Sequence, residues 1–264
     1  SEELLERIAE DGYLSSVRDY HTLNVLGSRG YDNFLMTGCP ALYSLDHINS
    51  EFDYGKPKKI GFSLGVSLKA SKRMELQMKN AILKTIEIFK DSEVEVVFHH
   101  GIGENYLKSD GVAVDLAKAQ VRFIKWLEVN SIAYVDISGS AENLINYYKL
   151  CDLHIGYRVH AHIFCNSISK PSVLLNEDGR GIALREVIGG VTLDTYQKVN
   201  TSKAMKAAHK LNLTVDNMLP ADSVIEDFER LMKYETSHGI KLAQPRKNID
   251  LHYSVMAKFI NQLP

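Results

Sequence analysis

No stretch of this chain stays apolar for the ~18 consecutive residues that a helix needs to cross a bilayer. Its first residues also lack the basic, apolar and small-residue order of a secretory signal peptide. On these two absences the sequence predicts a cytoplasmic protein, either free or held at the inner face of a membrane.

Cysteine is scarce as well, with three residues among 264. An odd number without a Cys-x-x-Cys pair fits neither a disulfide framework nor the usual zinc-ligand spacing. Cys39, Cys151 and Cys165 each stand in an apolar context. We therefore expect three reduced, buried thiols, as in a protein of a reducing compartment, and no disulfide.

The chain lacks a surplus of either charge, because 31 lysines and arginines face 33 aspartates and glutamates, for a formal net charge of −2. A general nucleic-acid binder carries a basic surplus, so we expect no nucleic-acid partner. The rest of the composition, 45% hydrophobic and 24% charged, is ordinary for a globular protein. A length of 264 residues suits one large domain or two modest ones.

Short apolar segments alternate with segments of helical periodicity over most of the chain. Ile60–Val66, Val94–Phe98 and Ile132–Ile137 are predicted to be buried strands, each followed by a helical pattern. This alternation is typical of a Rossmann-like, doubly wound parallel α/β sheet. Apolar stripes over Val224–Met232 and Val255–Ile260 predict that the chain closes with helices.

The residues before this sheet supply only two strand–helix steps of another Rossmann-like lobe, with strands predicted at 14–17 and 33–36. We therefore expect an incomplete N-terminal lobe, either naturally reduced or cut short. A polar segment that contains Gly55 and Pro57 predicts the linker between the lobes. The predicted parts are a partial N-terminal lobe at 1–56, a C-terminal Rossmann-like lobe at 57–200, and helices at 201–264 that pack back toward the first lobe.

Arg158 and His160 lie where a predicted strand passes into a predicted helix. Leu153–Gly156 is a short apolar strand, and apolar residues recur at helical spacing over Ala161–Ile168. The carboxyl ends of strands in an open α/β sheet carry the ligand site, and a helix N-terminus there favours an anion. Arg158 adds a planar fork for a carboxylate or phosphate, and His160 adds a group that exchanges a proton near neutral pH.

Two segments resemble the polysaccharide pyruvyl transferase family, in the family's order: SSVRDYHTLNVLGSRGYDNFLMTGCPAL and GYRVHAHIFCNSISKPSVLLNEDGR. With the pattern between them, the likeness covers Ser15 to Gly190. The resemblance implies a two-lobe, glycosyltransferase-B-like architecture in which a C-terminal helix crosses back to the first lobe. It also implies phosphoenolpyruvate as donor, a sugar of a cell-surface polysaccharide (capsule or exopolysaccharide) or of its lipid-linked precursor as acceptor, and neither metal nor cofactor.

The same resemblance suggests the site residues. His160 matches the histidine of the family's Arg-x-His motif, and we expect it to act as the acid or to bind phosphate, while Arg158 clamps the donor anion. Arg18 matches an arginine of the first motif, and Lys69 lies in the first loop of the second lobe, so both are donor-binding candidates. A carboxylate of the first lobe is expected to deprotonate the sugar. Strand ends and a turn supply the candidates for lining the cleft, namely His99, His100, Glu104, Asp178 and Arg180.

The candidate arginines also have a structural interpretation. Arg158 can pair with Asp152 or Glu177, and Arg18 can pair with Asp19. Residues 177–180 are predicted to form a solvated polar turn after the last strand.

His162 stands two residues after His160, so on a helix the two rings point to opposite sides and do not converge on one metal ion. His162 is therefore predicted to be structural or to lie at the surface. Two other functions fit the same sequence. One is a glycosyltransferase that uses a nucleotide sugar, whose ribose Glu177 or Asp178 would hold. The other is a non-catalytic scaffold lobe in polysaccharide assembly, favoured by the incomplete first lobe.

Overall fold

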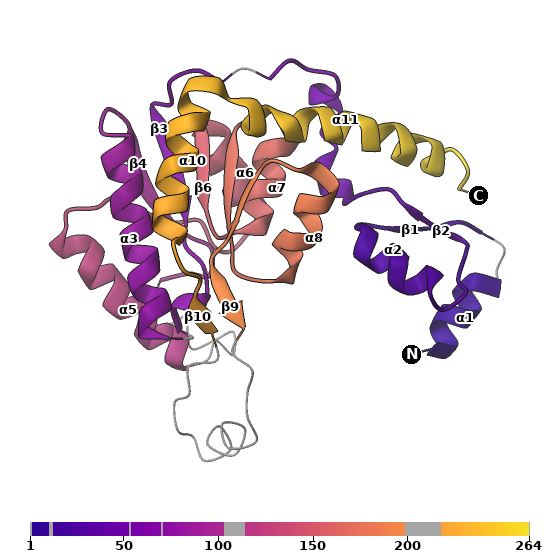
Figure 1. Ribbon diagram of the computed structural model, residues 1–264, viewed down its shortest axis with the longest axis horizontal. Coiled ribbons are helices and arrows are strands. Elements are labelled where there is room, and N and C mark those ends of the chain that lie inside the picture. Colours follow the sequence, from indigo (N-terminus) through magenta and orange to yellow (C-terminus); the bar gives the residue numbers. More distant parts are fainter. Residues whose placement is uncertain are drawn as a thin grey trace, which may run out of the picture.

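A six-stranded parallel sheet forms the centre of the molecule (Figure 1). The computed structural model describes residues 2–10, 13–52, 54–69, 71–102, 114–198 and 218–263. The strands stand in the order β5-β4-β3-β6-β7-β8, and each neighbouring pair is parallel. Their bounds are β3 Lys59–Ser63, β4 Glu93–Phe98, β5 Tyr134–Asp136, β6 Leu153–Gly156, β7 Ser172–Asn176 and β8 Val191–Asp194. The predicted Rossmann-like, doubly wound α/β sheet is thus confirmed.

The strand order reverses in the middle of the sheet. The chain runs outward from β3 through β4 to β5, then returns and runs the other way from β6 through β7 to β8. Open α/β sheets bind ligands at this switch point, outside the carboxyl ends of the strands. Ser63 of β3 pairs there with Gly156 of β6. A Cβ atom on Gly156 would lie 2.3 Å from the Ser63 carbonyl oxygen, and a φ of +140° also favours glycine.

Helices cover both faces of the sheet. α3, α5 and α10 bury one face around Phe62 of β3, and α6 and α7 bury the other around Val97 of β4. Ser71 and Ser140 cap α3 and α6 as predicted, because each side chain accepts the N–H of the residue three positions on. These helices are α3 Lys72–Ile88, α5 Val114–Val129, α6 Ala141–Leu150, α7 Val159–Ser167 and α10 Val224–His238.

The first lobe holds two parallel strands and two helices, and it lies to the side of the main sheet (Figure 1). Its apolar face does not form a core alone. Val17, Leu26 and Met36 pack into one cluster with Ile163 of α7 and Leu184 of the helix α8, Gly179–Ile188. The position of this lobe is therefore coupled to the two helices that start at the switch-point edge. Its elements are α1 Glu2–Glu10, β1 Ser15–Val17, α2 Tyr20–Gly27 and β2 Phe34–Met36.

The long C-terminal helix α11, Ile240–Ile260, lies along both parts of the molecule (Figure 1). Its Ile249 joins the cluster shared by the first lobe, α7 and α8. Asp250 accepts the N–H of Asn49 at 3.0 Å, so the linker region is held by the same helix. None of the helices in the described ranges is long and apolar enough to cross a membrane. The boundaries at residues 56 and 200 remain predictions.

Three elements differ from the sequence-based expectation. Residues 177–180 are not a solvated turn, because Asp178 caps the helix α8, Gly179–Ile188, and Arg180 belongs to its first turn. Strand β8 extends the sheet past the last predicted strand. A short antiparallel pair, β9 Tyr196–Lys198 and β10 Met218–Pro220, precedes the closing helices. These segments are short or rich in glycine and polar residues, so periodicity gave no signal for them.

Candidate functional site

Helix α7 begins directly at the switch point. Arg158 is its N-cap residue, with an extended backbone (φ −95°, ψ 109°) and no side-chain capping bond. An uncapped first turn presents N–H groups and the positive end of the helix dipole, which favour an anion. The structure therefore places Arg158 and His160 at the carboxyl edge of the two central strands, where the sequence predicted them.

The Arg158 side chain is mostly buried, with only 11% of it exposed. Its Nη2 donates to His100 Nε2 at 2.6 Å, and its Nη1 lies 4.0 Å from a Glu177 carboxylate oxygen. Burial lowers the pKa of Arg158, and the nearby Glu177 carboxylate opposes that shift. Because the arginine donates to His100 Nε2, that nitrogen is the unprotonated acceptor of the ring. Of the alternative partners foreseen for Arg158, Glu177 is the neighbour and Asp152 is not, since Asp152 accepts from the N–H groups of Lys58 and Lys59 at the other end of β3.

His99 lines the same edge and faces inward. Its Nε2 lies 2.8 Å from the Tyr148 hydroxyl, and the Tyr148 side chain is completely buried. Burial, followed by the positive charge of Arg158, lowers the pKa of His99 to about 3. His99 is therefore a neutral ring near pH 7 and supports the crevice wall instead of carrying charge.

His160 is exposed, as Arg18 and Arg180 are, whereas Arg158 is only partly exposed. Burial of part of its ring lowers the pKa of His160, and three arginines lower it further, in the order Arg180, Arg158 and Arg18. The positive charges of both lobes therefore converge on one histidine. We call His160, Arg18, Arg158 and Arg180 the basic cluster. With no anion bound, its mutual repulsion favours neutral His160.

The two outer arginines of the basic cluster are held by aspartates. Arg180 donates through Nε to Asp178 at 3.0 Å, and Asp178 also accepts the Arg180 backbone N–H at 2.9 Å. Arg18 lies 3.5 Å from Asp19 and is 61% exposed, so the structural pairing foreseen for Arg18 is present. Both arginine side chains are exposed to solvent, which weakens such ion pairs, and an arriving anion can compete with the aspartates.

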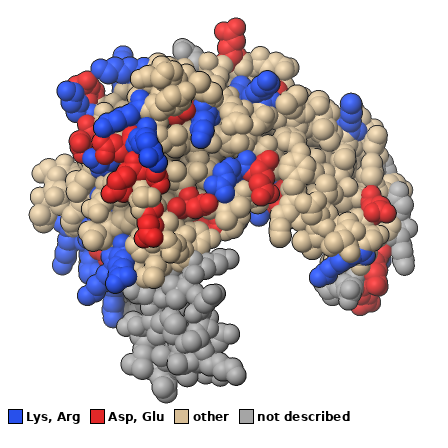
Figure 2. All heavy atoms as spheres, in the orientation of Figure 1, with Lys and Arg blue, Asp and Glu red and all other residues tan. Residues whose placement is uncertain are grey.

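The interlobe surface is hollowed between the first lobe and the body of the second lobe (Figure 2). A cavity of about 30 Å³, close to the volume that one water occupies, lies at this junction. Its lining comes from α7, from α8, from the turn before α2 and from the turn after β2: Arg18, Asp19, Cys39, Val159, Ile163, Arg180, Ala183 and Leu184. The two arginines therefore reach the same gap from opposite lobes.

Glu177 fills the anion position at the turn after β3. Its carboxylate accepts the N–H groups of Val66 at 3.1 Å and Ser67 at 2.9 Å. Gly65 makes room for it, because a Cβ atom there would lie 2.4 Å from the carboxylate. Amides that often hold a ligand phosphate in this fold are thus satisfied by the chain itself. The groups that remain to bind a donor anion are the basic cluster and the N–H groups at the start of α7.

The remaining candidates give less. Lys69 lies in a 3₁₀ turn, Ser67–Lys69, and its side chain is outside the described part of the structure. Glu104 lies outside the described residues altogether. His162 is fully buried, as its structural interpretation predicted. Within the described ranges, no group of three or more His, Cys, Asp or Glu side chains is arranged to hold a metal ion.

Two residues that contact this site were not predicted. The Ser63 hydroxyl accepts the backbone N–H of Arg158 at 3.0 Å, and it lies 2.8 Å from His154 Nε2. The only sequence signal was His154 itself, a polar residue inside the apolar strand Leu153–Gly156. A completely buried histidine needs hydrogen-bond partners, so its presence pointed to a polar interior under the crevice.

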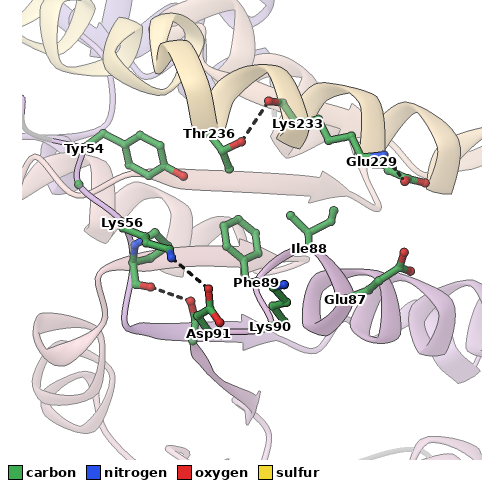
Figure 3. Close-up of a pocket in the computed structure, with 13 residues that line it drawn as sticks. Tyr54, Lys56, Glu87, Ile88, Phe89, Lys90, Asp91, Glu229, Lys233 and Thr236 are labelled. Atoms are coloured by element: carbon green, nitrogen blue, oxygen red, sulfur yellow. Dashed lines mark hydrogen bonds and ion pairs between the residues drawn. The ribbon is translucent and has the colours of Figure 1, made fainter.

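A larger hollow, of about 640 Å³, lies at the opposite end of the sheet (Figure 3). It is bounded by Pro57 and Ser92, which precede β3 and β4, and by residues of α10. Two ion pairs line it, Lys56 with Asp91 at 3.0 Å and Lys233 with Glu229 at 2.7 Å. Neither Arg158 nor His160 lines it, so size alone does not identify the functional site.

Comparison with known proteins gives a family match. The sequence model of the polysaccharide pyruvyl transferase family matches residues 1–179, which include both Arg18 and the Arg158–His160 segment. No curated protein matches the chain in sequence.

Three solved structures are similar to this chain. A mutant of S. aureus TarM, in complex with fondaparinux, α-GlcNAc-glycerol and UDP, is 12% identical with a TM-score of 0.48, over 96% of this chain and 44% of that one. The pneumococcal O-GlcNAc transferase GtfA, in complex with UDP and GlcNAc, is 10% identical with a TM-score of 0.38, over 93% of this chain and 45% of that one. The wall teichoic acid polymerase TagF is 10% identical with a TM-score of 0.32, over 99% of this chain and 60% of that one. This chain thus spans about half the length of these structures, and TM-scores below 0.5 are no sign of shared function.

Proposed function

Because this chain belongs to the polysaccharide pyruvyl transferase family, we propose that it forms a pyruvate ketal on a sugar, with phosphoenolpyruvate as the donor. The acceptor would be a cell-surface polysaccharide or its lipid-linked precursor. The observation that supports the proposal is the basic cluster, in which arginines of both lobes lie near enough to His160 to lower its pKa. We also propose that the basic cluster is where the donor binds.

The donor suits the charges around it. Phosphoenolpyruvate carries a carboxylate and a phosphate on three carbon atoms, so it needs several cationic donors within a small volume. Arg158 places a mostly buried guanidinium group beside an uncapped helix start. Arg180 and Arg18 approach the same gap and can exchange their aspartate partners for the donor. Lys69, in the turn after β3, is a further donor-binding candidate.

The proposed reaction exchanges one C–O bond to phosphate for two C–O bonds to the sugar. The donor's methylene carbon gains a proton, which makes the neighbouring carbon electrophilic, and one sugar hydroxyl adds there. The second hydroxyl then displaces phosphate and closes the ketal ring. Of the two hydroxyl protons, one balances the proton on the new methyl group and the other leaves with phosphate. A carboxylate of the first lobe would accept the hydroxyl protons.

His160 is the proposed acid. It is exposed, so it can exchange protons with solvent, and the neighbouring arginines keep its pKa low while the site is empty. A bound trianion reverses the sign of the local field and raises that pKa, because opposite charges favour the protonated ring. Donor binding would therefore load the proton that the methylene carbon receives.

Donor titration tests this function directly. Phosphoenolpyruvate should bind saturably in calorimetry and raise the melting temperature, and inorganic phosphate or pyruvate alone should bind more weakly, since each carries part of the charge. A panel of UDP- and CDP-linked sugars should not stabilise the chain. Stabilisation by a nucleotide sugar without phosphoenolpyruvate binding would instead support the glycosyltransferase alternative. Absence of both responses would leave the scaffold alternative.

A further inference from the structure

Four buried side chains form a connected set beneath Arg158. Ser63 Oγ lies 2.8 Å from His154 Nε2. The other nitrogen of that ring, Nδ1, lies 2.6 Å from Ser172 Oγ. Ser172 Oγ also lies 2.7 Å from His162 Nδ1. All four side chains are at most 1% exposed. We call Ser63, His154, Ser172 and His162 the Ser–His set.

Both ends of the Ser–His set meet the same residue. The backbone N–H of Arg158 donates to Ser63 Oγ at 3.0 Å, and the backbone carbonyl of Arg158 accepts the N–H of His162 at 3.0 Å. The second bond is the first turn of α7, while the first bond crosses to the end of β3. The N-cap residue of α7 is thus fixed to the two central strands on one side and to its own helix on the other.

His154 is the bridge of the set, because β6 lies between β3 and β7 in the sheet. One imidazole ring reaches a serine on each neighbouring strand, using both of its nitrogens. Burial keeps the pKa of His154 well below its ordinary value, so the ring is neutral and has one donor and one acceptor. A buried polar side chain is costly without partners. The contacts of His154 therefore explain a histidine in an apolar strand.

We propose that Ser63 and His154 are positioning residues for donor binding: they hold the Arg158 backbone so that its guanidinium stays beside His100 at the crevice. This inference rests on the proposed function, in which Arg158 binds the donor. Neither residue belongs to the basic cluster. Their effect on the donor is transmitted through the Arg158 N–H and the start of α7.

The geometry of the N-cap makes this effect large. Arg158 has no side-chain capping bond, so its backbone position depends on the Ser63 contact and the first helical turn. Loss of the Ser63 acceptor leaves the Arg158 N–H without its partner, and the turn relaxes to find another. The Arg158 side chain moves with it, away from the 2.6 Å contact with His100. Residues that orient binding groups in this way typically change affinity by about 10–100-fold when mutated at metal sites, and we expect the lower end here.

Replacing His154 by glutamine or by asparagine distinguishes a positioning role from a role in packing alone. In His154→Gln the amide reaches the place of Nε2 and retains a partner for Ser63. In His154→Asn it reaches the place of Nδ1, retains Ser172 and loses Ser63. We expect Ser63→Ala and His154→Asn to raise the dissociation constant and KM for phosphoenolpyruvate about tenfold with a smaller change in kcat. His154→Gln should restore both to within about threefold of the wild type.

A matched control lies at the opposite end of the sheet. Ser92 Oγ donates to the Pro57 carbonyl at 2.6 Å, so Ser92→Ala removes one comparable serine bond far from the crevice. It should lower the melting temperature and leave donor affinity unchanged. Wild-type donor affinity in folded Ser63→Ala, or identical donor affinity in His154→Gln and His154→Asn, would overturn the positioning role. If Ser63→Ala does not fold, the Gln–Asn pair decides.

The wild-type protein separates this inference from the function on which it rests. If it does not bind phosphoenolpyruvate, the proposed function fails. Positioning is then read from amide hydrogen exchange of the peptide that covers residues 157–162. Exchange should quicken in Ser63→Ala and His154→Asn but not in His154→Gln or Ser92→Ala. Unchanged exchange in all four variants would reject the positioning role as well.

Discussion

The two ends of the six-stranded sheet hold charge in different ways. At the carboxyl end, Arg158 is 11% exposed, and the nearest acidic oxygen among the described residues, on Glu177, lies 4.0 Å away. At the amino end, Lys56 is 80% exposed and lies 3.0 Å from Asp91. The first charge is buried but incompletely neutralised, which costs free energy unless a ligand completes it. The second is solvated and paired, so it offers a ligand little.

This difference shows why the larger hollow is the poorer candidate. The cavity at the amino end has about 640 Å³, against about 30 Å³ at the interlobe junction. The face over α3 and α10 beside the larger hollow carries lysines and acidic residues together, which Figure 2 shows as interspersed blue and red. Volume measures open space, whereas binding a small trianion depends on oriented positive charge. Paired substitutions, one at each end of the sheet, test this difference between the two ends.

The largest expected effect comes from glycine. Gly156→Ala would place a Cβ atom 2.3 Å from a Ser63 backbone oxygen at a φ of +140°, so the two central strands must separate. We expect a loss of about 4 kcal/mol or more in the free energy of unfolding. Gly55→Ala, at the amino end, meets no atom within 4 Å and should change stability by less than about 0.5 kcal/mol. Denaturant unfolding of both variants gives the comparison, and equal losses would contradict it.

His160→Asn should have the next largest effect, on turnover. Asparagine retains some hydrogen bonding but transfers no proton, so kcat should fall about 100-fold or more with little change in donor affinity. A parallel fall in affinity and kcat would assign His160 to phosphate binding. A lowered melting temperature with normal activity would make it structural. His238→Asn, at an exposed histidine at the end of α10, is the control and should retain wild-type turnover.

Mild acid should weaken the carboxyl end first. Burial lowers the pKa of His162, and burial with Arg158 lowers that of His99, to about 3 in each case. The unfolded chain has the ordinary histidine pKa near 6.5, so below that pH it binds protons that the folded chain refuses. Stability is full above about pH 6.5 and is lost as pH falls, by about 2 kcal/mol per histidine at pH 5.

The amino end gives no comparable loss over the same range. The Lys56 side chain lowers the pKa of Asp91, and Lys233 and Lys84 lower that of Glu229, so both carboxylates stay ionised at pH 5. Unfolding free energies measured from pH 7.5 to 5 should therefore fall less steeply in His162→Asn than in the wild type. Equal slopes would show that His162 is not a buried neutral ring.

The fold was largely predictable because its signals are local. Strand and helix alternation, the caps at Ser71 and Ser140, and the strand–helix junction at Arg158 each involve residues a few positions apart. Helix α8 was missed because Gly179 and Gly181 are weak helix formers. It forms because Asp178 caps it and because Leu184 and its neighbours pack against the first lobe.

The candidate site was predictable only where a motif marked it. Arg158 and His160 stand in one short segment, but their supports come from distant parts of the chain. Glu177 meets Ser67 across 110 positions, and His154 meets Ser63 across 91. No periodicity encodes such contacts, because they depend on which strands become neighbours in the finished sheet. A polar residue in an apolar strand signals that a partner exists without naming it.

Arg158→Lys tests the crevice charge with a smaller expected effect. Lysine keeps the charge but has a single ammonium group in place of the fork, so it cannot hold His100 and a donor anion together. Donor affinity should fall about tenfold, which corresponds to about 1.4 kcal/mol. Lys56→Ala removes an exposed ion pair at the amino end and should leave donor affinity unchanged. Calorimetric titration of both variants is the measurement, and an equal loss in both would contradict the comparison.

The smallest effect comes from one hydroxyl at each end. Tyr148 Oη lies 2.8 Å from His99 Nε2, whereas Tyr54 Oη, beside the larger hollow, is buried and has no hydrogen-bond partner among the described residues. Tyr148→Phe should cost about 1 kcal/mol, because it removes a buried bond and leaves His99 Nε2 unpaired. Tyr54→Phe removes a polar atom that gains nothing from burial, so stability should stay the same or rise by less than about 1 kcal/mol. Thermal unfolding of the two variants side by side measures the difference. A cost at Tyr54 as large as that at Tyr148 would mean that a bound water or ligand completes the amino-end hollow, and the contrast between the two ends would have to be withdrawn.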